Sequence, residues 1–249
     1  IGSKPSPLSS LGINPDENGQ DLTISTGKAS FNIDKHVFRP FNQVLLNDCG
    51  SRLTHKSNII LTDSDGFQWR PHVDSYLIEF LSPMRIVLLF TGRFLNREGN
   101  AGLSFFARLS AYTGLSTARI DFTVWNPQAA VHSGGLWDLG DPGSMFFKDL
   151  SFNFPVDSNN VTKIDWRMQP THPLNSLKPR RPVVGNVSSS STNLIIYQES
   201  SGGENWNSRN HINYLGVMPL RYKGYRVYHD SKVIEEGLRA TPIVYVSGK

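Results

Sequence analysis

Strict alternation of apolar and polar side chains is the feature that most restricts how this chain can fold. It is clearest over residues 118–125, where every second side chain is apolar. The apolar members are Ile120, Phe122 and Val124. A period of two belongs to a β-strand with one face in the core, not to a helix. The segment therefore predicts a strand, which Asn126-Pro127 ends because proline cannot donate to a ladder.

The same period, or a short apolar run between turn residues, recurs along the chain, and helical periodicity is almost absent. The further predicted strands lie at 22–26, 29–33, 44–46, 59–61, 73–81, 85–94, 103–112, 145–154, 193–198, 222–229 and 243–246. The run 73–81 has apolar residues on both faces, so we expect it to be buried on both sides. Together the pattern predicts an all-β, antiparallel barrel or sandwich.

Changes in composition suggest how the chain is divided. Residues 1–20 are rich in Ser, Pro, Gly and Asn and predict an N-terminal arm, and residues 21–168 carry most of the strand signals. Residues 169–191 are rich in Pro, Ser and Asn and predict a linker. Residues 192–249 supply only three or four strands, which is thin for an independent domain, so we expect part of a β-sandwich there.

The overall composition excludes several classes of protein. Charged residues make up 18% of the 249 and the formal net charge is +4, with the basic residues scattered, so no nucleic-acid interface is expected. No apolar run reaches about 18 residues, so no membrane-spanning helix is expected. The one cysteine, Cys49, allows neither an intrachain disulfide nor a cysteine-based metal site. Asn160 and Asn186 begin N-x-S/T sequons, which matter only in a secreted protein.

Two glycine-rich loops carry the residues that are candidates for function. The first, at 132–144, contains His132, Trp137, Asp138 and Asp141, and its Asp-Pro-Gly sequence predicts a tight turn. The second, at 200–211, repeats the composition. Its candidate residues are Glu204, Asn205, Trp206, Asn210 and His211.

An indole beside carboxylates and amides is what a carbohydrate site uses. The aromatic face stacks on the apolar side of a sugar, while the polar groups bind its hydroxyls. The alternative is structural, with Trp137 and Trp206 as hydrophobic plugs and the polar groups serving loop backbone. Both interpretations stay open on sequence alone.

Catalytic and metal chemistry is less well specified. His132 and His211 are residue types that act as acid or base, but sequence does not show a positioned partner. Asp138 and Asp141 could supply oxygen ligands to calcium, although no EF-hand spacing is present, and we expect no other cofactor. No nucleophile elbow, Rossmann fingerprint, P-loop or zinc motif occurs. No catalytic residue is therefore assigned.

The sequence from Asn126 to Ser144, followed by Phe147-Lys148-Asp149-Leu150, resembles the N-terminal domain of exo-acting rhamnogalacturonan lyases of fungi and their bacterial YetA-like relatives. Residues 200–206 and 219–227 are similar to the segment that enters that family's second domain. The resemblance implies a RIFT-type β-barrel, a central β-sandwich and an α/α toroid that carries much of the cleft. This chain has no helical repeats, so it departs from the family by lacking the toroid.

The resemblance implies a secreted, carbohydrate-associated β protein that binds a polysaccharide and is not catalytic alone. Two alternatives are a structural or adhesive module that self-associates, and a fragment of an active lyase that works by β-elimination. Elimination needs a group that neutralises the uronate carboxylate, a base and an acid. The residue types present that could contribute are Arg209, Arg221, His132 and His211.

Overall fold

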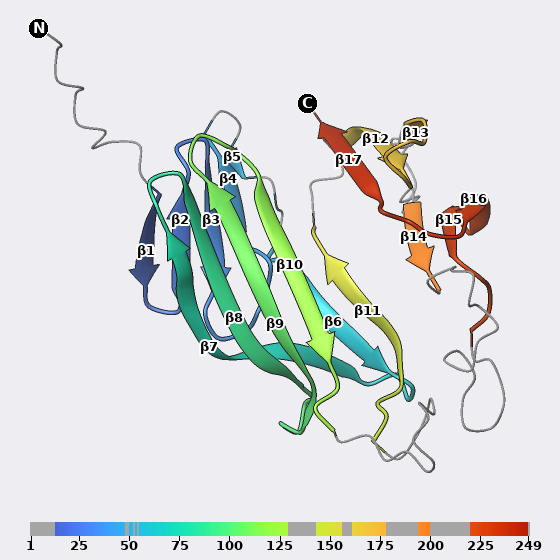
Figure 1. Cartoon of the computed structure of the whole chain (residues 1–249), viewed down its shortest axis with the longest axis horizontal. Coiled ribbons are helices and arrows are strands. Elements are labelled where there is room, and N and C mark those ends of the chain that lie inside the picture. The colour runs from blue at the N-terminus through green and yellow to red at the C-terminus, as the bar shows by residue number, and fades with distance from the viewer. Residues whose placement is uncertain are drawn as a thin grey trace, which may run out of the picture. The chain divides into compact units, whose positions relative to one another are not determined.

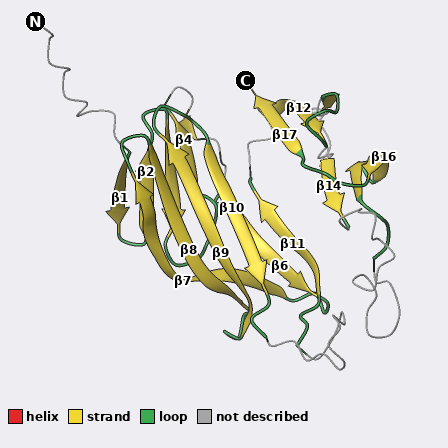
Figure 2. Cartoon of the chain, in the orientation of Figure 1, coloured by secondary structure: helices red, strands yellow, loops and turns green. Residues whose placement is uncertain are grey.

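The computed structural model describes residues 13–47, 50–51, 53, 55–128, 143–155, 161–177, 194–199 and 220–248. Within these ranges every regular element is a strand and all pairings are antiparallel, which confirms the predicted all-β class (Figure 2). None of the described residues forms a helix that could cross a membrane. The chain divides into two compact units, residues 1–129 with 143–156, and residues 130–142 with 157–249.

Unit 1 begins with a five-stranded sheet in chain order (Figure 1). Its strands are β1 (Asn14–Asn18), β2 (Asp21–Ser25), β3 (Ala29–Asp34), β4 (Gln43–Leu46) and β5 (Gly50–Ser51). Buried and partly exposed side chains alternate along β3, as the period of two predicts. A turn joins β2 to β3, with Gly27 at a φ of 83°, which glycine adopts without strain.

The second sheet of unit 1 has the order β10-β9-β8-β7-β6-β11. Its strands are β6 (Asn58–Asp63), β7 (Gln68–Leu81), β8 (Arg85–Leu95), β9 (Ala101–Tyr112), β10 (Ala118–Trp125) and β11 (Phe147–Asn153). Figure 1 shows β7 running beside β8 and then turning toward β6. Phe122 on β10 and Phe152 on β11 come from opposite ends of the strand order, yet their ring centroids lie 5.2 Å apart. The sheet therefore curls toward closure.

The core of unit 1 lies between the two sheets. Leu22 and Ile33 from the first sheet and Phe90, Phe94 and Phe105 from the second are all buried in one apolar cluster. The predicted inward residues of β10 pack against this cluster. At one corner, the Tyr76 hydroxyl on β7 donates a hydrogen bond of 2.8 Å to Glu17 on β1. The two sheets are thus joined by apolar packing and by a polar contact.

The expectation that residues 73–81 are buried on both sides is wrong. Val73 is buried, but Leu77, Phe80 and Leu81 are about half exposed. Beyond Val73, β7 pairs with β8, and among the described residues no other strand lies on its far side. An apolar run on both faces therefore marks a surface here and not a buried central strand.

The described residues of unit 2 form two three-stranded sheets, ordered β13-β12-β17 and β14-β15-β16. Its strands are β12 (Val161–Arg167), β13 (Asn175–Leu177), β14 (Leu194–Gln198), β15 (Tyr225–His229), β16 (Lys232–Gly237) and β17 (Ile243–Gly248). The buried members of its core are Trp166, Met168, Tyr225 and Val227. This core is much smaller than that of unit 1.

The observed division of the chain differs from the expected one, which kept residues 21–168 together. The strand β12 belongs to unit 2 because it pairs with β17 near the C-terminal end, with Trp166 opposite Val244. The segment expected to be a linker, 169–191, includes β13, which extends the same sheet. A pairing between residues some 80 positions apart leaves no local signal in composition.

Candidate functional site

The nine residues proposed from the two glycine-rich loops lie outside the described part of the chain. They are His132, Trp137, Asp138, Asp141, Glu204, Asn205, Trp206, Asn210 and His211. The carbohydrate-site interpretation of these loops therefore stays a prediction. The sequons at Asn160 and Asn186 lie outside the described residues as well.

A groove in unit 1, at the start of β7, is the candidate site in the described residues. It consists of two hollows that share Gln68, Asn96 and Arg97. The basic hollow has a volume of about 390 Å³ and is lined by Val37, Arg39, Gln68, Arg70, Pro71, His72, Leu95, Asn96 and Arg97. The aromatic hollow has a volume of about 570 Å³ and is lined by Asp63, Gly66, Phe67, Gln68, Trp69, Asn96, Arg97 and Glu98.

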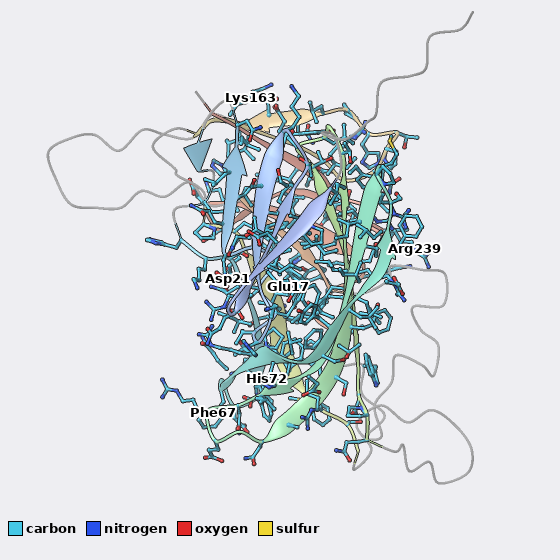
Figure 3. All side chains as sticks on the ribbon, turned by 90° about the vertical axis from the view of Figure 1, so that its left-hand side faces the viewer. Glu17, Asp21, Phe67, His72, Lys163 and Arg239 are labelled. Atoms are coloured by element: carbon cyan, nitrogen blue, oxygen red, sulfur yellow. The ribbon has the colours of Figure 1, made fainter. Side chains whose placement is uncertain are left out.

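The turn between β6 and β7 positions the aromatic hollow. Gly66 has a φ of 93°, which glycine adopts without strain. One carboxylate oxygen of Asp63 accepts the backbone N–H groups of Asp65 and Phe67 at 3.0 and 2.8 Å. These bonds fold Ser64-Asp65-Gly66 into a tight turn. It leaves Phe67 69% exposed, and Figure 3 labels this side chain in the lower part of the view.

Trp69 forms the wall behind this exposed ring. Its indole N–H donates a hydrogen bond of 2.8 Å to the second carboxylate oxygen of Asp63. That bond, together with the backbone N–H groups of Phe67 and Asp65, lowers the pKa of Asp63 below its ordinary value. Asp63 is thus a carboxylate at neutral pH that holds the turn and the indole in place.

Alternation along β7 sends polar side chains into the basic hollow. Gln68, Arg70 and His72 are exposed, whereas Pro71 and Val73 are buried. The segment that carries Arg39 is attached to this part of β7 by a bridge between Val37 and His72. The Phe38 N–H donates to the Pro71 carbonyl at 2.9 Å, and the Val73 N–H to the His36 carbonyl at 2.7 Å. Arg39 is therefore carried beside Arg70 although the two are far apart in sequence.

The turn between β8 and β9 supplies the third arginine. The Asn96 carboxamide oxygen accepts the backbone N–H groups of Glu98 and Asn100 at 3.0 and 2.9 Å. Gly99 closes the turn with a φ of 85°. Register sets its place in the groove, because Arg70 lies opposite Leu95. Arg97 comes two residues after Leu95, and this places it at the end of the groove that Arg70 lines.

Two arginines of the groove differ from three others of the curled sheet. Arg93, Arg108 and Arg119 each bind a carboxylate, at N–O distances of 2.9, 2.7 and 2.7 Å respectively. The guanidinium groups of Arg70 and Arg97 have no ion pair or hydrogen bond within the described part of the chain. Arg39 lies 4.0 Å from Asp34, at the limit for an ion pair. Arg70 and Arg97 therefore present guanidinium groups that no described carboxylate neutralises.

Unit 2 contains a second polar cluster, centred on the Glu235 carboxylate. It accepts hydrogen bonds from Trp166 Nε1 at 3.2 Å, Asn175 Nδ2 at 3.0 Å and the Tyr225 hydroxyl at 3.1 Å. These donors come from β12, β13 and β15, so the carboxylate on β16 joins the two sheets of the unit. The arrangement is that of a structural tie whose donors and acceptors are mutually engaged.

Arg221, one of the residue types considered for elimination, is held by a partner. Its guanidinium binds both oxygens of Glu199, at 3.1 and 2.9 Å, and its backbone N–H donates to the same carboxylate at 2.9 Å. These contacts raise the pKa of Arg221 and lower that of Glu199. Arg221 thus stabilises the approach to β15, while Arg209 lies outside the described residues.

Among the described residues, no group of three or more His, Cys, Asp or Glu side chains is placed to hold a metal ion. Comparison of the chain with models of known protein families and with curated proteins gives no match.

The sequence alone did not identify the groove as a site. One signal was present, since Gln68, Arg70 and His72 alternate with Trp69, Pro71 and Val73. The contribution of Arg39 and Arg97 depends on a bridge and on a strand register, which a single sequence does not specify.

Proposed function

We propose that this chain is a carbohydrate-binding β module whose binding site is the groove at the start of β7, and that it is not catalytic alone. This is the function expected from the resemblance to the rhamnogalacturonan lyases, and the site is one that the sequence did not suggest. A secreted protein whose ligand is a polysaccharide remains the setting that we propose for it.

The observation that carries the proposal is the exposed Phe67 ring in a hollow that is also lined by polar side chains. A ring that is 69% exposed is available to stack on the apolar face of a sugar. Gln68, Asn96 and Arg97 line the same hollow and can bind hydroxyl groups. An aromatic wall with a few converging polar groups is the usual composition of a small-ligand site.

The test is affinity electrophoresis of the full chain in gels that contain rhamnogalacturonan, polygalacturonate or neutral galactan. We expect retardation by at least one of them, and about fivefold weaker binding in Phe67→Ala, because a stacked ring contributes about 1 kcal/mol. Phe80→Ala is the matched control, since Phe80 is an exposed ring on the far part of β7. Equal retardation of the wild type and Phe67→Ala, or no retardation by any of the three, would contradict the proposal.

A measurement of product separates binding from catalysis. We propose that the chain releases no unsaturated uronate from rhamnogalacturonan, and the ultraviolet absorbance of that product is the assay. Product formed by the purified chain would instead favour the lyase-fragment alternative.

The exposed end of β7 favours a second candidate function, which is self-association. Leu77, Phe80, Leu81 and the neighbouring Met84 are all about half exposed or more. Leu77 and Phe80 lie opposite Leu89 and Val87 in the ladder with β8, so they share one face of the strand, and exposed apolar side chains gathered on one face are a feature of interaction sites. Sedimentation velocity of the wild type and of the double variant Leu77→Lys/Phe80→Lys tests it, because an assembly built on this surface dissociates in the variant.

A further inference from the structure

We propose that the basic hollow binds a tetrahedral oxyanion ester, a sulfate or phosphate group carried on the glycan. The inference rests on the proposed carbohydrate-binding function and adds the chemical class of substituent that one end of the groove selects. It concerns the hollow lined by Arg39, Arg70, His72 and Arg97.

The charge of this hollow is the first argument. Its lining includes three guanidinium groups and no carboxylate. Like charges that share one hollow repel each other, and the repulsion is larger near protein than in bulk water. Elsewhere on the curled sheet Arg93, Arg108 and Arg119 are neutralised by Asp74, Glu79 and Asp121, and Arg85 lies over the Phe80 ring, whereas in the hollow only Arg39 has a carboxylate near it, Asp34 at 4.0 Å. In the basic hollow, an anion from outside the protein would remove the repulsion.

The second argument is that the three arginines lie on three different segments of the chain. Arg39 follows the bridge to β7, Arg70 lies on β7 and Arg97 is in the turn after β8. A carboxylate has two coplanar oxygens, and a single guanidinium fork is enough to bind both. A sulfate or phosphate ester has three terminal oxygens that point in different directions. Guanidinium groups on three separate segments therefore match the ester better than the carboxylate.

The junction between the two hollows is the third argument. Arg97, Gln68 and Asn96 line both of them. A glycan with one sugar ring against Phe67 would therefore extend along these shared residues toward the basic hollow. The aromatic hollow would bind the sugar ring, and the basic hollow would bind the charged substituent on it.

The test uses one glucan backbone with different substituents, so that only the charged group changes. Binding of the full chain to dextran, carboxymethyl dextran, dextran sulfate and dextran phosphate of matched charge density is measured at physiological salt. We expect at least about tenfold tighter binding to the sulfate or the phosphate than to the carboxymethyl form, which equals about one charge-assisted hydrogen bond. The two ester arms show which of the two groups is preferred.

Two variants show whether the basic hollow causes the difference. Arg70→Gln/Arg97→Gln should lose the preference for the ester, whereas Arg119→Gln should keep it, because Arg119 is paired with Asp121 outside the groove. Equal binding of the carboxymethyl and ester forms would overturn the inference. Survival of the preference in the double variant would also overturn it, since the attraction would then be non-specific.

Inorganic sulfate and phosphate separate this inference from the proposed function. Their titration is followed by the NMR signals of the Arg70 and Arg97 side chains. Saturable shifts with an inorganic anion, together with no glycan retarded through Phe67, would leave the oxyanion site intact and contradict only the carbohydrate function. Glycan retardation through Phe67 without shifts from either anion would overturn the oxyanion site alone.

Discussion

The two units of this chain are held together by different means. In unit 1 the sheets enclose one large apolar cluster, which includes Phe90, Phe94 and Phe105. Among the described residues of unit 2 the buried core consists of four side chains, and the Glu235 carboxylate joins the sheets through donors from three strands. A small core buries little apolar surface, so polar contacts take a larger share of its stability.

The units also differ in how their arginines are partnered. In unit 1 the guanidinium groups of Arg70 and Arg97 have no carboxylate partner among the described residues. In unit 2 Arg221 and Arg226 are paired with glutamates, and Arg167 donates to the Pro170 carbonyl. The basic hollow is therefore a feature of the unit with the larger described core.

The largest expected effect comes from the core of unit 1. Phe105 is fully buried and its ring lies within 6 Å of those of Phe38, Phe94 and Phe122. Phe105→Ala should lower the free energy of unfolding by about 3–5 kcal/mol, because it leaves a cavity. Urea denaturation measures it, with exposed Phe80→Ala as the control. A loss below about 1 kcal/mol would mean that apolar packing does not dominate this unit.

The next effect concerns the polar tie of unit 2. Glu235→Ala should destabilise the unit by about 1–3 kcal/mol, because the indole, amide and phenol donors lose their acceptor. Glu235→Gln keeps one acceptor oxygen and should cost less. Amide hydrogen exchange on β12 and β15 is the measurement, since these strands carry Trp166 and Tyr225. Equal exchange in the two variants would show that the hydrogen bonds to Glu235 do not hold the sheets together.

A smaller effect is the acid sensitivity of the groove. The pKa of Asp63 is lower in the folded chain than its ordinary value of 3.8, mainly because Trp69 donates to it. The resulting stability is present above pH 3.8 and is lost as the pH falls through the lower folded value. Asp63→Asn keeps an acceptor for the indole but cannot titrate.

The chemical shift of the Trp69 indole N–H, followed on acidification from neutral pH to about 3, measures this effect. The wild type should show a transition below the ordinary aspartate range, and Asp63→Asn should show none at this proton. A transition of equal size in both proteins would mean that another group controls the indole.

The smallest expected effect is a gain in stability. Arg97→Gln removes one of the like charges from the basic hollow and should raise Tm by about 1–2 °C at low salt. Arg119→Gln removes a paired charge and should not raise it. If both variants shift Tm equally and in the same direction, the unpaired state of Arg97 has no energetic consequence.

The sequence predicted the fold class because β alternation is local. The turns at Gly27 and Gly66 and the inward residues of β10 follow from a few neighbouring residues. The prediction that residues 73–81 are buried on both sides was wrong, because burial depends on whether another layer covers the strand and not on the composition of the strand itself. The boundary between the two units depends on the pairing of β12 with β17, and the convergence of Arg39 and Arg70 depends on the bridge between Val37 and His72. Pairings between distant segments leave no local signal in a single sequence.

The most direct test of the account is to map where a charged glycan binds on the full chain. Backbone amide shifts are recorded as sulfated dextran oligosaccharides are added to the ¹⁵N-labelled protein. We expect saturable changes in the amide shifts of Gln68, Arg70, Asn96 and Arg97, and we expect these changes to be lost in Arg70→Gln/Arg97→Gln. Changes confined to residues 132–144 and 200–211, or no change in the groove, would contradict the account.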